Sequence, residues 1–340
     1  MHESTFRLLE RLAPAQLSEI CLRAMVLERV CALEPVGRRA LAQRLRMRER
    51  EVRAVCESLR EDGLLEMSAA GMSVTPKARP LMEEARSISR TRLGTATLET
   101  QLEHLLGIAR VRIAPEGEIG QVGRIAAQHI RSQLKNGSIL AVSGGETVRA
   151  VAEAIAPGNP VDALVLPARG GFGEKVEVQA DTLAEEFALR LGGRHRLLHM
   201  PDGLPEDMRR EFVKIESVSQ TLDDLRHTDI LLYGVAGIEK MASERQMHPR
   251  REQELTGAGA KAFVLGSWYD AHGRRIEGYD EGLMAGWDIG SVPHVVAVAC
   301  GEKKAAAVIA VARHHAHELL VVDEGCARAM LEALRADQAE

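Results

Sequence analysis

Apolar residues follow two different rhythms along the chain. From about Leu17 to Arg60 they recur at spacings of three and four residues, as in amphipathic helices. After Ile108 the pattern changes to short apolar runs separated by helical segments. Alternation of strands and helices is typical of a parallel sheet with helices on both faces. The sequence therefore predicts two domains, a helical one over residues 1–91 and an α/β one of Rossmann-like type over residues 92–340.

The first domain has the outline of a winged helix-turn-helix. The expected elements are a helix from about Leu17, a short helix from Gly37, a helix over Glu49 to Glu61, strands over residues 64–67 and 72–75, and a wing tip over residues 68–71. The inward-facing positions expected of the two shorter helices are Ala40, Leu41, Leu45, Val52, Val55 and Leu59. Gly63 ends the last helix, as glycine often does.

Positive charge is concentrated in this region. The net charge is −5, yet residues 1–90 hold 16 lysines and arginines against 13 acidic residues, and Val36 to Arg60 holds eight arginines and three glutamates. An arginine run alone often only solubilises a helix. Here it coincides with the second helix of a three-helix unit followed by a wing, so we expect contact with a double-stranded DNA operator. The residues expected at the DNA are Arg38, Arg39, Arg46, Arg48, Arg50 and Arg53, with the wing near Ala69 and Ala70 approaching the flanking backbone.

The segment from Lys77 to about Gly107 is helical in pattern, with Leu98, Leu102 and Leu105 at helical offsets. We interpret it as a connector that can add to a dimer contact. Winged helices of this kind usually occupy two half-sites, so a homodimer or homotetramer is expected.

The second domain is predicted from its strands. Those expected cover residues 110–113, 138–142, 163–166, 197–200, 230–233, 295–299 and 319–322, and helices between them include residues 120–134 and 146–156. In such sheets a ligand binds outside the carboxyl ends of the strands.

Three glycine-containing loops follow these strands. Gly144, Gly145, Glu146 and Thr147 join a strand to a helix, where free N–H groups favour an anion. Arg169 follows the next strand between small residues, and Lys304 follows the strand that ends near Ala299. Each feature is weak alone, and the spacing is not that of the dinucleotide-binding fingerprint. Together they favour a small anionic ligand.

Other chemistry is not indicated. The five cysteines are scattered, odd in number and without metal-ligand spacing, which fits a reduced cytoplasmic protein. The cluster of His314, His315 and His317 is interpreted as a polar helix end, because no carboxylate or cysteine completes a metal pattern. The sequence contains neither a signal peptide nor an apolar run of membrane length, so no membrane partner, no metal, no cofactor and no catalytic residue is predicted.

The chain also resembles a known family. Stretches such as VGRRALAQRL, SGGETVRAVAEAI, LPARGGFGEKVEVQADTLAEE, YGVAGIEKMASERQ, VAVACGEKKAAAVIA and VVDEGCARAML are similar to the SorC/DeoR-type bacterial transcription regulators, in the same order. The resemblance implies a repressor with a domain like sugar-phosphate isomerases but without their turnover, released by fructose-1,6-bisphosphate or a related phosphosugar. It also implies that Gly144, Gly145, Glu146 and Thr147 line one phosphate site, that Arg169 and Gln179 reach the ligand, and that Arg245 and Lys304 bind the other phosphate or the sugar.

Two alternatives stay open at this point. A carboxylate at a helix N-terminus competes with a phosphate for the same N–H groups, so Glu146 leaves room for a ligand with one phosphate or with a different group altogether. An enzyme with an appended DNA-binding domain is the competing class, with Lys304, Asp323 and Glu324 as acid/base groups.

Overall fold

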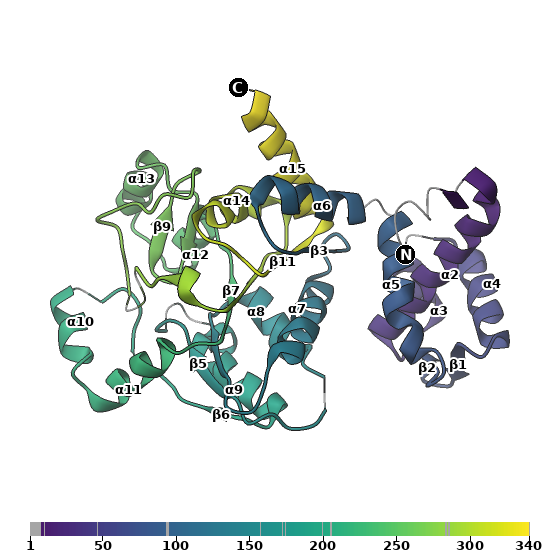
Figure 1. Cartoon of the computed structure of the whole chain (residues 1–340), viewed down its shortest axis with the longest axis horizontal. Coiled ribbons are helices and arrows are strands. Elements are labelled where there is room, and N and C mark those ends of the chain that lie inside the picture. The colour runs from purple at the N-terminus through teal and green to yellow at the C-terminus, as the bar shows by residue number, and fades with distance from the viewer. Residues whose placement is uncertain are drawn as a thin grey trace. The chain divides into compact units, whose positions relative to one another are not determined.

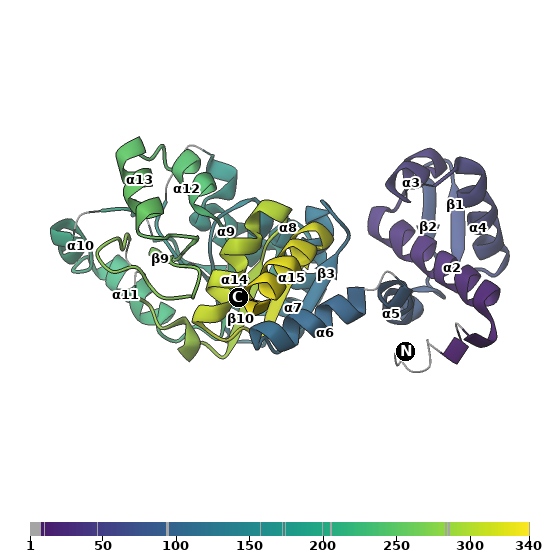
Figure 2. The ribbon, with the colours of Figure 1, turned by 90° about the horizontal axis from the view of Figure 1, so that it is seen from above.

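The computed structural model describes residues 8–9, 11–45, 47–92, 95–156, 158–171, 173, 175–198, 200–204, 206–282, 284 and 286–339. The chain divides into two compact units, Met1–Thr97 and Leu98–Glu340, each visible in Figures 1 and 2. The sequence pattern places this division slightly earlier, after residue 91. Across the described ranges, the helices are too short or too polar to span a bilayer.

The N-terminal unit is a winged helix-turn-helix. Its elements are α2 (Pro14–Leu33), α3 (Arg38–Leu45), α4 (Glu49–Glu61), β1 (Leu65–Ser68), β2 (Gly71–Val74), the 3-10 turn η1 (Arg79–Leu81) and α5 (Met82–Arg92). Helix α4 has the predicted bounds. Strands β1 and β2 form an antiparallel wing in which Leu65 pairs with Val74, and a bridge from Val36 to Met72 ties the wing to the start of α3.

The core of this unit differs slightly from the predicted one. Val52 and Leu59 are buried as expected, but Cys56 is the third buried residue of α4 and Val55 is half-buried. In α3 the prediction for Ala40 is wrong: it is exposed, and Ala42 is buried beside Leu41. Positions 40 and 42 lie ~200° apart around a helix, so the buried stripe of α3 runs through Leu41 and Ala42 and leaves Ala40 outside it.

The C-terminal unit is built on a parallel sheet of seven strands in the order β3-β11-β10-β7-β4-β5-β6. These strands are β3 (Val111–Ala114), β4 (Ile139–Val142), β5 (Leu164–Pro167), β6 (Arg194–His195), β7 (Ile230–Gly234), β10 (His294–Val298) and β11 (Leu319–Asp323). Chain order reverses between β4 and β7, since β4 leads outward to β5 and β6 while β7 leads to β10 and β11. Such a switch point opens a crevice at the carboxyl edge of the sheet.

Helices cover both faces of this sheet (Figures 1 and 2). One face carries α7 (Ile119–Gln133), α8 (Glu146–Glu153) and α9 (Ala180–Leu191), and the other carries α6 (Thr95–Leu106), α11 (Glu216–Leu225), α14 (Ala305–His314) and α15 (Glu324–Ala339). Strand β7 contributes apolar side chains to both faces of the sheet. Ile230 and Leu232 pack in the core under α7, α8 and α9. Leu231 and Tyr233 pack in the core on the other face, as the two-residue period of a strand requires.

Between β7 and β10 the chain makes an excursion that contributes a separate small layer. It contains α12 (Ile238–Glu244), α13 (Pro249–Gly257) and the antiparallel hairpin of β8 (Ala262–Val264) and β9 (Ser267–Tyr269). The remaining elements are α10 (Glu206–Phe212) and the 3-10 turns η2 (Val176–Val178), η3 (Ile289–Ser291) and η4 (Glu302–Lys304). Phe263 and Trp268 stack across the hairpin with ring centroids 4.8 Å apart.

One predicted strand needs correction. A strand was expected over residues 197–200, but the edge strand is β6 at Arg194–His195, while Leu198 and Met200 pack in a small cluster with Val218 of α11. The leucines of the expected connector belong to the C-terminal unit, and the dimer contact expected of this segment stays a prediction. Leu98 and Leu102 are buried in the core of the C-terminal unit, and Leu105 packs against it.

Helices α7 and α8 pack so closely that a glycine is required between them. A Cβ at Gly123 would lie 2.2 Å from the carbonyl oxygen of Ala150. We expect Gly123→Ala to lower the free energy of unfolding of the C-terminal unit by about 1–3 kcal/mol, the usual cost of overpacking. Gly120→Ala in the same helix is the control, because no atom lies within 4 Å of its Cβ position. Thermal unfolding of both variants checks this, and equal midpoints would contradict it.

Candidate functional site: a cavity at the carboxyl edge of the sheet

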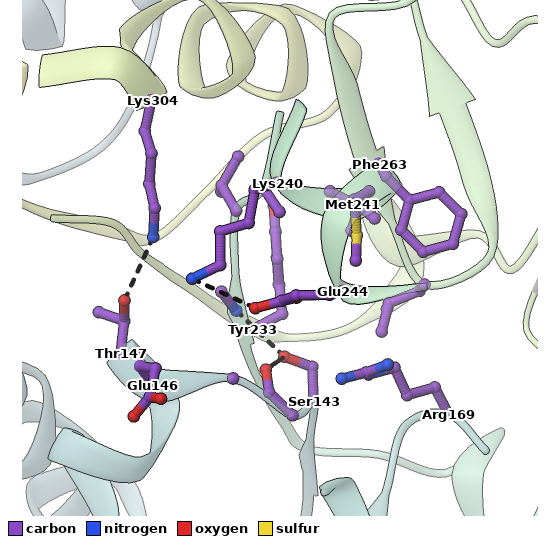
Figure 3. A pocket seen from close by; sticks show the side chains of 17 residues that line it. Ser143, Glu146, Thr147, Arg169, Tyr233, Lys240, Met241, Glu244, Phe263 and Lys304 are labelled. Carbon is purple, nitrogen blue, oxygen red and sulfur yellow. Dashed lines mark hydrogen bonds and ion pairs between the residues drawn. The ribbon is translucent and has the colours of Figure 1, made fainter. Parts of the chain in front are cut away.

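A cavity of about 60 Å³ lies at the switch point of the sheet. Its walls come from the loop after β4 (Ser143 to Thr147), from Arg169 after β5, from the end of β7 with α12, from the β8–β9 hairpin, and from Lys304 after β10. Figure 3 shows the labelled side chains of this lining around the cavity. The carboxyl ends of parallel strands meet here, which is where open α/β sheets bind ligands.

The loop after β4 is held in a conformation that only glycine adopts easily. Gly145 has φ +115°, and its N–H donates to the carbonyl of Val178 at 2.9 Å. The hydroxyl of Ser143 accepts from the N–H of Gly234 at 3.1 Å, which joins the loop to β7. These bonds fix the entry to α8. The first amides of α8 have no carbonyl partner within their own helix and carry its positive dipole end, so they favour an anion.

Lys304 brings a positive charge to the same place. Its Nζ lies 3.4 Å from the hydroxyl of Thr147 in the first turn of α8 (Figure 3). Burial and the nearby Lys240 lower the pKa of Lys304. A bound anion would favour its charged form and offset both effects. The pair of Lys304 and the α8 N-terminus is therefore suited to a phosphate or carboxylate.

Two further cations line the cavity, each beside a carboxylate. Lys240 of α12 pairs with Glu244 one turn later at 3.3 Å. Arg169 has a side chain only 11% exposed and lies 4.0 Å from a carboxylate oxygen of Asp202. Burial lowers the pKa of Arg169 to about 10, so it remains protonated at neutral pH.

The opposite wall of the cavity is apolar. It consists of buried side chains from α12 and the hairpin, namely Met241, Phe263, Val264 and Leu265. Leu265 has φ +46°, an uncommon conformation for a branched residue, and forms the tight turn of the hairpin with Gly266. A ligand bound here would have an anionic end at α8 and a carbon skeleton against this wall.

Comparison with known proteins agrees with this geometry. Residues 91–332 match the family described as "Putative sugar-binding domain". The chain belongs to this family. Residues 20–88 match a second family, the CggR N-terminal DNA binding domain.

Two similar proteins are named as regulators. The chain is 29% identical over 330 residues to the central glycolytic genes regulator of Bacillus subtilis (strain 168), covering 95% of this chain and 97% of that protein. It is 28% identical over 332 residues to the protein of the same name from Priestia megaterium, covering 94% and 96%.

Solved structures of SorC-type regulators have the same fold. A SorC family transcriptional regulator from Enterococcus faecalis shares 27% identity with a TM-score of 0.61, covering 69% of this chain and 99% of that one. The full-length sorbitol operon regulator SorC from Klebsiella pneumoniae has a TM-score of 0.65, covering 87% and 94%, at 15% identity, where the likeness shows the fold alone. This member of the sugar-binding domain family is a DNA-binding transcriptional regulator.

Six of the eight expected effector residues line the cavity. These are Gly144, Gly145, Glu146, Thr147, Arg169 and Lys304. Gln179 and Arg245 are not among the lining residues. Gln179 is the N-cap of α9 and donates to the carbonyl of Lys175 at 3.0 Å, while Arg245 lies over the Phe263 ring, 4.4 Å from its centroid.

Sequence reasoning missed the lining residues of α12 and the hairpin, Lys240 and Glu244 among them. A signal for α12 was present, because Gly237 follows strand β7 and opens a helix just as Gly145 does after β4. The hairpin gave no comparable signal. Val264 and Leu265 form part of an ordinary apolar run whose place at the cavity follows only from the tertiary fold.

Asp323 and Glu324, the two carboxylates of the enzyme hypothesis, have other partners in the structure. Asp323 is 1% exposed, and its two oxygens accept from the N–H groups of Gly301 at 2.8 Å and Gly117 at 2.9 Å. Glu324 pairs with Arg328 at 2.6 Å on the exposed face of α15. Asp323 therefore positions the loop that leads to Lys304, and neither carboxylate lines the cavity.

The histidine cluster is partly buried, contrary to the expected polar helix end. His314 ends α14 and is exposed, but His317 is 3% exposed. The Tyr233 hydroxyl hydrogen-bonds the Nε2 atoms of both His315, at 2.9 Å, and His317. Burial lowers the pKa of His317 to about 4, so it stays neutral at physiological pH. The described residues contain no group of histidine, cysteine and acidic side chains arranged to hold a metal.

The expected DNA-contacting arginines lie on the surface of the winged helix. Arg38 and Arg39 in α3, Arg48 at the N-cap of α4, and Arg50 and Arg53 in α4 are all exposed; Arg46 lies outside the described residues. Two of them have acidic partners: Arg39 lies 3.6 Å from Glu49, and Arg53 pairs with Glu57 at 2.7 Å.

Proposed function

We propose that this protein is a transcriptional repressor whose affinity for its operator falls when a phosphorylated sugar binds in the cavity at the carboxyl edge of the sheet. Fructose-1,6-bisphosphate and related phosphosugars are the candidate effectors. One observation carries the proposal: the N-terminus of α8, Thr147 and Lys304 form an anion site at the switch point of a chain whose other unit is a winged helix-turn-helix.

The proposed roles of the residues follow their positions. The amides of Glu146 and Thr147, the Thr147 hydroxyl and the Lys304 ammonium would bind a phosphate. Arg169 and Lys240 would meet sugar oxygens or a further anionic group, and Gly144 and Gly145 allow the ligand to approach the backbone. Gln179 and Arg245 would act from behind the cavity wall.

The names of the relatives support genes of sugar and central carbon metabolism as targets. We further propose that the protein acts in the cytoplasm as a homodimer or homotetramer, since one winged helix covers one half-site. Effector binding would change how the protomers pack and so misalign paired half-sites. By linkage, the ligand can weaken DNA binding only as far as it prefers the arrangement that does not fit the operator.

The competing enzyme hypothesis is less well supported. A general base must lie within hydrogen-bond reach of the proton it removes. The two carboxylates that line the cavity, Glu146 and Glu244, pair with lysines, and Asp323 is occupied by backbone amides. Incubation of the protein with phosphosugars, followed by product analysis, tests this directly, and turnover would favour an enzyme.

Lys304→Gln is the experiment that tests the proposed effector site. Loss of a charge-assisted hydrogen bond costs about 1.5–3 kcal/mol, so we expect phosphosugar affinity to fall about ten- to hundredfold. Lys303→Gln is the matched control, because this neighbouring lysine is exposed and does not line the cavity. Calorimetric titration of both variants gives the answer. Equal affinities in the two would remove Lys304 from the site.

The lowered pKa of Lys304 gives the site a pH dependence. A lysine is charged below its pKa, so phosphosugar affinity is full at neutral pH and is lost as pH rises through the pKa of Lys304, sooner than for an ordinary lysine. Lys304→Arg should bind the ligand without this loss, because arginine stays protonated over the same range. Titrations between about pH 7 and pH 10 compare the two proteins; parallel pH profiles would count against the assignment.

A further inference from the structure

We infer that the cavity selects a sugar with a single phosphate and discriminates against bisphosphorylated sugars. This rests on the proposed function, because it assumes that a phosphosugar binds at the N-terminus of α8. It follows from an imbalance between the two ends of the cavity. The cation at one end is available to an anion, whereas the cations at the other end already have carboxylate partners fixed by the backbone.

The available end is the one at Lys304. Within the described ranges Lys304 makes no ion pair, and its polar contact is the neutral hydroxyl of Thr147 at 3.4 Å. The free amides of the α8 N-terminus lie beside it. A phosphate placed here would gain an unpaired ammonium, a hydroxyl and backbone N–H groups without displacing any anion.

The other end lies across the cavity, where Figure 3 shows Arg169 on the side away from Lys304. Arg245 lies behind Arg169, and the carboxylate of Asp202 is the partner of both guanidinium groups. Asp202 has a side chain only 2% exposed, 2.6 Å from Arg245 and 4.0 Å from Arg169. Arg245 also pairs with Glu281. A second phosphate at this end would therefore meet guanidinium groups that already have carboxylate partners, and would lie close to those carboxylates.

Asp202 is held in place by its backbone. Its N–H donates to the carbonyl of Gly171 at 2.8 Å, and the N–H of Gly171 donates to the carbonyl of Met200 at 2.9 Å. The fit is close, because a Cβ at Gly170 would lie 2.4 Å from the Met200 carbonyl oxygen and one at Gly282 would lie 2.1 Å from the Asp202 carboxylate. These bonds fix the backbone at Asp202, and the close approach of Gly282 leaves little space around its carboxylate, which pairs with Arg245.

Glu281 is fixed in a similar way. Its N–H donates to the carbonyl of Gly266 at 2.7 Å, in the turn of the β8–β9 hairpin. A second cation, Arg251, lies 3.8 Å from the Glu281 carboxylate and stacks 4.5 Å from the centroid of the Tyr279 ring. Asp202, Glu281, Arg245 and Arg251 thus form a network of ion pairs behind the cavity wall.

Glu146 adds negative charge at the rim. It is the first residue of α8, lines the cavity and pairs with Lys175 at 3.1 Å, with 38% of its side chain exposed. One phosphate at Lys304 can be accommodated beside it, since Lys175 offsets the Glu146 charge. A second phosphate would add negative charge that Glu146 repels, while Lys240 and Arg169, the other described cations of the cavity lining, already lie beside carboxylates.

The wall opposite α8 points the same way. It is apolar, with the buried side chains of Met241, Phe263 and Leu265 in the lining. An apolar wall can cover the uncharged face of a sugar but cannot stabilise a second phosphate.

The test compares ligands that differ by one phosphate. Full-length protein is titrated calorimetrically with fructose 1-phosphate, fructose 6-phosphate and fructose 1,6-bisphosphate. We expect at least one monophosphate to bind about tenfold more tightly than the bisphosphate. Bisphosphate binding as tight as that of both monophosphates would overturn the inference while leaving the proposed function standing. Failure of all three to bind would instead overturn the proposed function on which the inference depends.

Three variants locate the discrimination. Asp202→Asn and Glu146→Gln each remove one negative charge, and we expect each to reduce the preference for the monophosphate about tenfold. Glu153→Gln is the control, since it makes the same change at the far end of α8, outside the cavity. Glu146 is partly exposed, so its variant keeps the test valid if Asp202→Asn does not fold. An unchanged preference in Glu146→Gln, or an equal change in Glu153→Gln, would contradict the inference.

Discussion

Replacement of Arg50 by alanine is expected to lower operator affinity about ten- to hundredfold, since a bidentate contact from arginine to guanine contributes about 1–3 kcal/mol. Arg50 is exposed in the first turn of α4, and within the described residues it makes no ion pair. Arg53, one turn later, must exchange Glu57 for DNA. Arg50 should therefore show the larger effect of the two.

The measurement is fluorescence anisotropy with an operator first selected from random duplexes. Arg60→Ala is the matched control, because Arg60 is also exposed on α4 but stands in its last turn. Phosphosugar binding should be the same in every variant. Arg50→Lys separates base recognition from phosphate contact, since lysine keeps the charge and loses the planar fork. Unchanged operator affinity in both Arg50→Ala and Arg53→Ala would remove α4 as the recognition helix.

The winged helix was accessible to sequence reasoning because its signals are local. The apolar spacing of Val52 and Leu59, the arginines around them and Gly63 after the last turn together define α4 at its observed bounds. The strands of the sheet were equally plain where both faces are buried, as in β4 and β11. Buried parallel strands are continuous apolar runs, which the sequence displays directly.

Strand β6 shows where local signals fail. Both of its residues, Arg194 and His195, are exposed, so this edge strand carries no apolar run. The apolar segment over residues 197–200 suggests a strand, but its Leu198 and Met200 pack against Val218 instead. An edge strand is defined by its backbone pairing to β5, and that pairing leaves no trace in the side chains.

The cavity shows the same division between local and distant information. Its glycine loop was found because strand, glycines and helix are adjacent in sequence. The sequence does not reveal the partners of Arg245, because Asp202 lies 43 residues before it and Glu281 lies 36 residues after it. Similarly, the burial of His317 depends on Tyr233, which is 84 residues away. A basic residue can be located from sequence, but whether it is already neutralised is a property of the tertiary fold.

The second large effect is expected at Gly144, where alanine should abolish effector response while leaving operator binding intact. A Cβ at this position would lie 2.5 Å from the carbonyl oxygen of Val178 and 2.3 Å from Nη2 of Arg169. The arginine tip can move, but the Val178 carbonyl is backbone and also accepts the N–H of Gly145. The methyl group must therefore displace the loop that aims the α8 amides at the ligand. We expect phosphosugar affinity to fall about a hundredfold, by comparison with the 1–3 kcal/mol cost of overpacking.

Gly237→Ala is the matched control for this variant. Gly237 also lies between a strand and a helix, β7 and α12, but the nearest atoms to its Cβ position are 3.7 and 4.0 Å away, at ordinary contact distance. The readout is operator affinity with and without phosphosugar. Linkage requires that an effector which no longer binds has no influence on DNA, so the ratio of the two affinities should approach one in Gly144→Ala and stay at the wild-type value in Gly237→Ala. A Gly144→Ala protein that releases DNA normally would show that the input to the winged helix lies outside the glycine loop of α8.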